Sequence, residues 1–340
     1  MRENCIASKG SATFISYPVP MQLRAVVVGS GPNGLAGAIA LAQAGVNVTV
    51  VEAEETIGGG MRSAELTLPG FTHDICSAVH PMAVASPFLR SLHLERRGLE
   101  WIHPDAPLAH PLDDGTAVML ERSVESTANA LGPDARAYRS LFAPLVREAP
   151  SLLDSLLKPL FPPRHPLALA RFGLLALRSA SGLSRSRFRG ERARALFAGL
   201  AAHSLLSLDA PGSASFGLVL GMTAHAWGGP VARGGSQRIA DALAAELTAL
   251  GGSIITGKRV MDDSDLAGTD VVMFDTSPRV LVSIAGDRLQ RRYTRNLLRY
   301  RDGPGVFKVD WALSEPRERN VAEGANTRPV ALVGGVNWLT

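Results

Sequence analysis

Residues 23–63 read LRAVVVGSGPNGLAGAIALAQAGVNVTVVEAEETIGGGMRS, and this stretch predicts a strand, a glycine-rich turn, a helix and a second strand. The run Arg24–Val28 is rich in valine, as expected of a strand that is buried on both faces. Residues 33–44 predict a helix, and residues 46–51 predict a second apolar strand. We therefore expect an α/β fold whose parallel sheet begins with this βαβ unit.

A glycine pattern occupies the turn between the first strand and the helix. Gly29, Gly31 and Gly34 are spaced as G-x-G-x-x-G, and the residues between them are Ser30, Pro32 and Asn33. Such glycines allow a tight turn and a close approach of a diphosphate to the start of the helix. Glu52 ends the second strand, where a carboxylate can accept hydrogen bonds from ribose hydroxyls. The pattern predicts dinucleotide binding, whereas a turn that only tightens the corner would leave the acid unexplained.

A second glycine-rich turn follows Glu52 closely. It contains Gly59 and Gly60, and it ends in Arg62 and Ser63. The guanidinium of an arginine is a permanent, planar cation that suits a phosphate. The alternative for Arg62 is a solvated arginine on a surface loop.

These residues are similar to the phytoene desaturase-like family of FAD-dependent oxidoreductases. This group includes carotenoid desaturases and isomerases and pyridine nucleotide-disulfide oxidoreductase domain-containing protein 2. The similarity resumes at AHAWGGPVARGGSQRIADALAAELTALGG, at DTSPRVLVSIAGD and at YRDGPGVFKVDWAL, and so extends over residues 23–313. It implies a Rossmann-type FAD-binding domain of the glutathione-reductase-like or amine-oxidase-like kind, with an inserted α+β substrate domain.

The same resemblance implies how FAD would be held and used. The second glycine turn and Arg62 would approach the FAD diphosphate, and the backbone of Val260 would meet the adenine. The implied activity is dehydrogenation or isomerisation of a hydrophobic, polyisoprenoid or lipid-like molecule, with a hydride passing to flavin N5. An NAD-linked dehydrogenase is disfavoured by the second glycine turn, and amine oxidation stays open. The sequence identifies no catalytic residue.

The resemblance also sets the expected domain limits. Residues 1–22 form a tail, residues 23–98 and 233–286 the FAD-binding domain, residues 99–232 a largely helical substrate domain, and residues 287–340 the start of a second substrate-domain segment. Family members continue well beyond the position of Thr340, so the chain resembles a C-terminally truncated oxidoreductase. A nucleotide-binding or interaction fragment without catalytic activity is therefore the alternative function.

Composition excludes several classes of protein. A net charge of +4 is too small to indicate a nucleic-acid-binding protein. The two cysteines, Cys5 and Cys76, form no CxxC pair, which excludes a disulfide-reductase mechanism and suits the cytoplasm. The eight histidines show no HxH or HxxxH spacing, so we expect no metal site. The sequence does not predict an oligomeric state.

Residues 158–194 combine leucine with many arginines and contain one acid, Glu191. One interpretation is a contact with a membrane surface, since basic amphipathic helices bind anionic interfaces. The other is a helical domain with solvated arginines whose stems cover apolar surface.

Several local features give further expectations. Pro133 and Pro150 predict helix boundaries, and Ser236 is the expected N-cap of a helix that starts at Gln237. Residues 253–256, 258–260, 270–275 and 306–313 predict strands. His73 and His80 are candidates for substrate binding or proton relay, and His225 and Trp227 for an apolar pocket. For all four side chains a structural role is the alternative.

Overall fold

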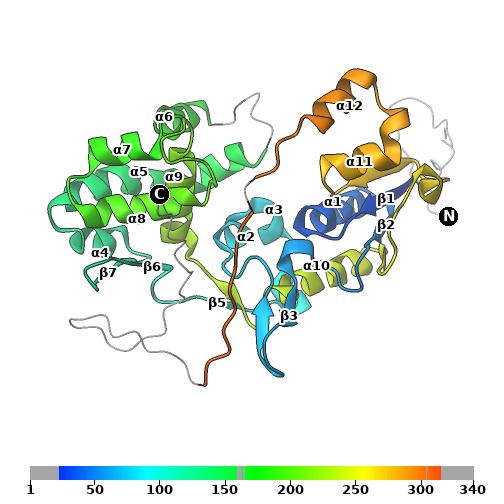
Figure 1. Cartoon of the computed structure of the whole chain (residues 1–340), viewed down its shortest axis with the longest axis horizontal. Coiled ribbons are helices and arrows are strands. Elements are labelled where there is room, and N and C mark those ends of the chain that lie inside the picture. Colours follow the sequence, from blue (N-terminus) through cyan, green and yellow to red (C-terminus); the bar gives the residue numbers. More distant parts are fainter. Residues whose placement is uncertain (1–22, 159–162, 164, 304, 315–340) are drawn as a thin grey trace, which may run out of the picture. The chain divides into compact units, whose positions relative to one another are not determined.

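The computed structural model describes residues 23–158, 163, 165–303 and 305–314 (Figure 1). The chain divides into two compact units, which we call the sheet unit (residues 1–59 and 243–300) and the helical unit (residues 60–242 and 301–340). Each unit is described by itself below. The domain limits expected from the sequence stay a prediction.

Four parallel strands form the centre of the sheet unit. They are β1 (Arg24–Val28), β2 (Asn47–Val51), β9 (Ser253–Ile255) and β10 (Val271–Phe274), in the order β10-β1-β2-β9. Val28 pairs with Val51 on one side and with Phe274 on the other, so three strands end at the same edge. Counted along the chain, the order across the sheet is 3-2-1-4, as in a Rossmann fold. The order reverses between β1 and β10, where such sheets bind their ligands.

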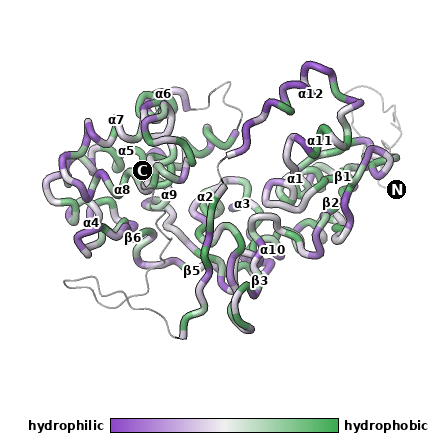
Figure 2. Tube along the Cα trace, viewed as in Figure 1, coloured by the Kyte–Doolittle hydropathy of each residue, from purple (hydrophilic) through white to green (hydrophobic). Residues whose placement is uncertain are grey.

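Helix α1 (Pro32–Gln43) connects β1 to β2. It buries Leu35, Ala38 and Ile39, three positions that share one face of a helix. At the carboxyl ends of the strands, Val28 and Val51 pack in one cluster with Val260. Helix α11 (Pro278–Ala285) adds Ile284 to this cluster, and the following α12 (Arg291–Leu298) is hydrophilic (Figure 2). Residues 237–249 form α10 (Gln237–Ala249), which continues from one unit into the other.

The helical unit has one large apolar core. Its helices are α4 (Val124–Asn129), α5 (Ala135–Leu156), α6 (Pro166–Ala176), α7 (Ala180–Arg187), α8 (Glu191–Ala202) and α9 (Ala214–Trp227). Phe142 of α5, Phe197 of α8 and Leu218 of α9 are fully buried there. A Cβ on Gly221 would lie 2.4 Å from the Phe142 ring, so this glycine lets α9 pack closely on α5.

Short elements complete the helical unit. Three antiparallel pairs join β3 (Ser63–Glu65) to β4 (Thr72–Asp74), β5 (Trp101–Ile102) to β8 (Val231–Ala232), and β6 (Leu108–Pro111) to β7 (Ala117–Leu120). Two further helices are α2 (Pro81–Ala85) and α3 (Pro87–Ser91). In the described part of the chain no helix has both the length and the hydropathy that a bilayer crossing requires.

Three predictions of local structure are wrong, one helix boundary and two strands. Pro150 does not end a helix, because α5 continues through both Pro144 and Pro150. A proline removes one helical hydrogen bond, and here the loss is offset by an apolar face that buries Leu141, Leu145 and Leu152.

Residues 306–313 and 258–260 form no strand. In residues 306–313, Phe307 is 91% exposed, so the alternating pattern does not correspond to a buried face. Among the described residues no strand pairs with this segment.

Candidate functional site

The first glycine turn has a geometry that only small residues permit. Gly29 has a φ of +102°, and a Cβ on it would lie 2.5 Å from the backbone oxygen of Asp275. A Cβ on Gly34 would lie 2.3 Å from the backbone oxygen of Gly29. These approaches place the start of α1 directly over the carboxyl end of β1, the arrangement by which helix amides reach a diphosphate.

Glu52 lies at the carboxyl end of β2 and is 6% exposed. Its Oε2 accepts hydrogen bonds from the Ser30 amide at 2.9 Å and from the Ser30 hydroxyl at 2.5 Å. Its Oε1 accepts from the Glu54 amide at 3.0 Å. These donors hold the carboxylate in one orientation and compensate its burial. The second residue of the glycine motif therefore positions the acid that ends the next strand.

The second glycine turn begins against the first. The Gly58 amide donates to both the hydroxyl and the carbonyl oxygen of Ser30, each at 3.1 Å. A Cβ on Gly59 would lie 3.1 Å from the Cα of Gly31. Both turns therefore need small residues where they meet, and the start of the second turn, Gly58 and Gly59, lies with the first turn at one edge of the sheet unit.

Asp275 is a further acid at this edge, and the sequence-based prediction of site residues missed it. It follows β10, and its Oδ2 accepts a hydrogen bond from the Gly34 amide at 2.8 Å. A Cβ on Gly31 would lie 2.6 Å from the same oxygen. The carboxylate thus accepts the hydrogen bond of one amide in the first turn of α1. Its position directly after a predicted strand, as for Glu52, is the signal that could have identified it.

The predicted site residues fall into two sets. The sheet unit brings together Gly29, Ser30, Gly31, Pro32, Asn33, Gly34, Glu52 and Gly59, with Val260 buried in the adjoining apolar cluster. Gly60, Arg62 and Ser63 belong to the helical unit. The cofactor-binding role of both sets stays a prediction.

Ser63 has a structural role in the helical unit. Its hydroxyl donates to Asp74 at 2.6 Å and accepts from the Gln237 amide at 3.0 Å, while Asp74 accepts from the Ser236 amide at 2.6 Å. Two side chains of the β3–β4 hairpin thus accept from the first amides of α10. The hydroxyl of Ser236, expected to cap this helix, instead donates to the Ser77 carbonyl at 2.6 Å. The β3–β4 hairpin therefore supplies the cap of α10, which the sequence did not predict.

The candidate histidines have protein partners. His80 Nε2 lies 2.7 Å from the Ser236 hydroxyl, and burial lowers the pKa of His80. His73 Nε2 lies 2.7 Å from the Thr67 hydroxyl.

His225 belongs to the core of the helical unit. Its Nδ1 lies 3.1 Å from the Arg122 carbonyl, which can only accept, so Nδ1 carries the proton and Nε2 accepts from the Tyr138 hydroxyl at 2.8 Å. Burial lowers the pKa of His225 and raises that of Tyr138. These contacts support the structural alternative for His225. Among the described residues, no group of three or more His, Cys, Asp or Glu side chains could hold a metal ion.

Comparisons with known proteins agree with this geometry. Residues 27–92 match the NAD(P)-binding Rossmann-like domain. One of the subunits of limonene dehydrogenase from Castellaniella defragrans is 35% identical over 125 residues, which are 36% of this chain and 22% of that protein. An oxidoreductase from Methanosarcina mazei has a similar fold, with a TM-score of 0.54, 18% identity, and coverage of 81% of this chain and 64% of that one.

A variant of putrescine oxidase also has a similar fold, with a TM-score of 0.51 and 19% identity over 82% of this chain and 63% of that one. The chain therefore spans less than two thirds of the length of these relatives. At such identities the likeness to the two solved structures concerns the fold alone.

Proposed function

We propose that the chain is a member of the phytoene desaturase-like superfamily of FAD-dependent oxidoreductases and that its glycine-rich corner binds FAD. In this proposal the first turn of α1 faces the diphosphate, and Glu52 accepts hydrogen bonds from the hydroxyls of the adenosine ribose. The choice of FAD over NAD is supported by the second glycine turn, whose start is hydrogen-bonded to Ser30 through the Gly58 amide.

The buried carboxylate of Glu52 is the observation that carries the proposal. A carboxylate that is 6% exposed is costly unless it is bonded, and Ser30 supplies an amide and a hydroxyl to the same oxygen. An apolar residue at this strand end would fill the space without that cost. The acid is explained if hydroxyl groups of a ligand are its target.

We propose further that the chain acts in oxidation or isomerisation of a hydrophobic, lipid-like molecule. When bound, FAD supplies the hydride acceptor, and the protein need only bind, orient and keep water from the reacting groups. In the sheet unit, Ser30 would fix the carboxylate that orients the adenosine end. Gly31 would let the diphosphate approach the backbone, because it has no side chain. The Asp275 carboxylate leaves no space for a side chain at this position.

Contact with a lipid surface is a separate part of the proposal. The solvent-facing stripe of α6 contains Leu167 and Leu174, and Leu177 continues it just after the helix; the three are 74%, 78% and 76% exposed. Arg171 lies on the same stripe, is 73% exposed and meets Glu148 at 3.4 Å, a weak pair at such exposure. The stripe therefore combines apolar groups with a cation that can exchange this partner for anionic lipid. Replacing Leu174 by glutamate should reduce sedimentation of the protein with phosphatidylglycerol vesicles. Replacing the half-buried Leu175 by methionine should not.

The cofactor is tested by incubating the purified full chain with FAD, FMN or NAD and separating free nucleotide by gel filtration. We expect FAD alone to stay with the protein, because FMN lacks the adenosine and NAD does not use the second glycine turn. Retention of NAD without FAD would contradict the proposal. If FAD is retained, anaerobic bleaching of its visible absorbance by alkene or polyene lipids tests the reaction, and binding without bleaching would favour the non-catalytic alternative.

A further inference from the structure

A groove outside the dinucleotide-binding corner lies between α7 and α8 of the helical unit. It has a volume of about 550 Å³, within the range of ordinary small-molecule sites. Small apolar side chains are part of its lining, among them Ala195 and Ala198. Three arginines line it, Arg185 on α7, Arg189 on the connecting loop and Arg194 on α8.

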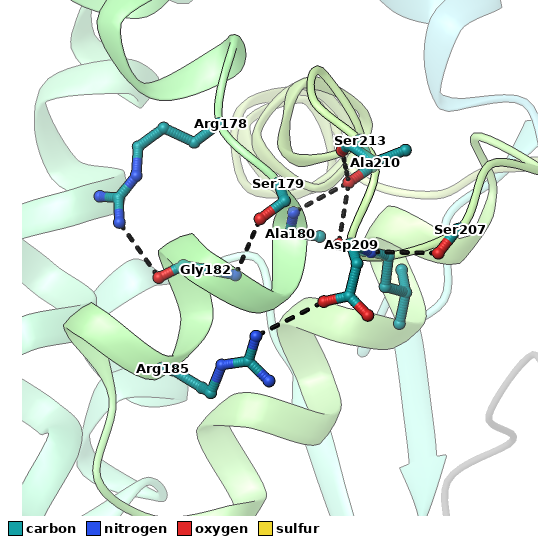
Figure 3. Close-up of polar contacts among 10 residues, drawn as sticks. Arg178, Ser179, Ala180, Gly182, Arg185, Ser207, Asp209, Ala210 and Ser213 are labelled. Carbon is teal, nitrogen blue, oxygen red and sulfur yellow. Dashed lines mark hydrogen bonds and ion pairs between the residues drawn. The ribbon is translucent and has the colours of Figure 1, made fainter.

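The charge of the lining is strongly positive. Glu191 is the acid that lines the groove, so the three arginines leave it with a net charge of +2. Arg185 also meets Asp209 at 3.4 Å, but both side chains are largely exposed, 67% and 75%, and such a pair is weak (Figure 3). Cations gathered in one groove repel each other unless an anion is bound between them.

The arginines of this region are of two kinds. Arg178 and Arg192 use their terminal nitrogens on the protein itself, Arg178 on the Gly182 carbonyl at 3.1 Å (Figure 3) and Arg192 on the Ala117 carbonyl at 2.7 Å. Neither lines the groove. Within the described part of the chain, the guanidinium of Arg189 meets no protein acceptor, and Arg194 uses only its Nε. Arg189 and Arg194, which line the groove, thus keep terminal N–H donors for a ligand.

The backbone that carries these arginines is held in place. Buried Asp134 accepts hydrogen bonds from the amides of Arg189 at 2.8 Å and Gly190 at 2.6 Å. The Nε of Arg194 donates to the Phe188 carbonyl at 2.9 Å, which fixes the direction of that side chain. On the opposite wall, the Ser181 amide donates to the Leu208 carbonyl at 3.0 Å. A site whose donors are positioned before binding loses less entropy when the ligand arrives.

We propose that this groove is a binding site for a phosphate group. A phosphate monoester carries a charge of about −1.5 to −2 at neutral pH and three acceptor oxygens, which matches the net charge and the donors of the lining. Arginine binds phosphate through paired N–H groups, and Ser181 and Ser184 add hydroxyl groups to the wall. The phosphate comes from a free phosphate or diphosphate compound or from a lipid headgroup. This proposal does not depend on the binding of FAD.

The groove variant for the test is Arg189→Gln with Arg194→Gln in the full chain. The matched control is Arg136→Gln with Arg187→Gln, which removes the same charge from exposed positions outside the groove. Both proteins are first checked by circular dichroism. Inorganic phosphate and pyrophosphate are then titrated by calorimetry at constant ionic strength, once without FAD and once with excess FAD, and sedimentation with phosphatidylglycerol and with phosphatidylcholine vesicles is measured in parallel.

We expect saturable binding of phosphate or pyrophosphate that the groove variant weakens about tenfold or more and the control variant leaves unchanged. Binding to phosphatidylglycerol vesicles alone, lost in the groove variant and kept in the control, would assign the site to a lipid headgroup. Equal losses in both variants, or no binding to either probe, would overturn the proposal.

Discussion

The two units of this protein bury their polar side chains in different ways. The sheet unit gathers them at one edge, where buried Ser30 and Glu52 and the half-buried Asp275 follow three neighbouring strands. The helical unit places a neutral pair, Tyr138 and His225, inside its apolar core. In the proposed function the carboxylate of Glu52 at the strand edge is positioned for a ligand, whereas the neutral buried pair joins α5 to α9.

Individual glycines also differ in what surrounds them. In the sheet unit, the position of a Cβ on Gly34 is blocked by a backbone oxygen, which cannot move without moving the strand. In the helical unit, Gly173 of α6 has no atom within 4 Å of such a Cβ. One glycine is therefore required by the fold, and the other only weakens its helix.

The largest expected effect comes from replacing Gly34 by alanine. The new Cβ would lie 2.3 Å from the Gly29 oxygen and 2.8 Å from Asp275 Oδ2, so α1 must shift off the sheet, at a cost of about 3 kcal/mol. Hydrogen exchange of peptides from β1 and β2 should rise, with peptides from α5 and α9 unchanged. Equal protection in the variant and the wild type would show that the close approach is not required.

The next effect is expected in the core of the helical unit. Changing Tyr138 to phenylalanine leaves the Nε2 of buried His225 without its donor, which should lower the free energy of unfolding by about 1–3 kcal/mol. Urea unfolding followed by tryptophan fluorescence measures this, because Trp101, Trp227 and Trp311 all belong to this unit. The control is Tyr293→Phe in α12, a position that is 50% exposed, and a loss as large in the control would refute the explanation.

Acidification should affect the helical unit more than the sheet unit. All eight histidines lie between residues 73 and 225, and burial lowers the pKa of His225, His80 and His110. Below about pH 6.5 the unfolded chain takes up protons that these folded side chains resist, so stability falls as the pH falls. The urea midpoint seen by tryptophan fluorescence should be lower at pH 5.5 than at pH 7.5. A midpoint that rises on acidification would contradict the assignment.

The smallest effect should have the opposite sign. Replacing Gly173 by alanine within α6 adds a methyl group where there is space and favours the helix, so stability should increase by about 0.5–1 kcal/mol. The increase is read from the same fluorescence-detected unfolding curve. Destabilisation would mean that another part of the protein packs against this position.

The sequence predicted the sheet unit more fully than the helical unit. The bounds of β1 were predicted, and the acid at the end of β2 was placed correctly, because strand, turn and helix follow one another within about thirty residues. The contact of Ser30 with Glu52 spans 22 residues, whereas that of Tyr138 with His225 spans 87. A contact between residues so far apart in the sequence leaves no local pattern. The helical region could therefore be predicted, but the buried pair of Tyr138 and His225 could not.

Two misses have a similar cause. The cap of α10 comes from Ser63 and Asp74, more than 160 residues before the helix, so the local serine was chosen instead. Asp275 was read only as the end of a strand, because its contact with Gly34 spans 241 residues. In both cases the sequence contains the side chain but not the position of its partner. That position depends on the order of the strands for Asp275 and on the place of the hairpin for Ser63 and Asp74.

The most direct measurement is the dissociation constant of FAD for wild type, Glu52→Gln and Asp275→Asn, with each fold checked by circular dichroism. If the corner binds FAD, Glu52→Gln should weaken binding about tenfold or more, because hydrogen bonds to a charged acceptor are lost. Asp275→Asn should bind FAD as tightly as wild type or more tightly, because it removes a negative charge beside the start of α1. FAD binding that is undetectable in the wild type, or unchanged in Glu52→Gln, would contradict the account.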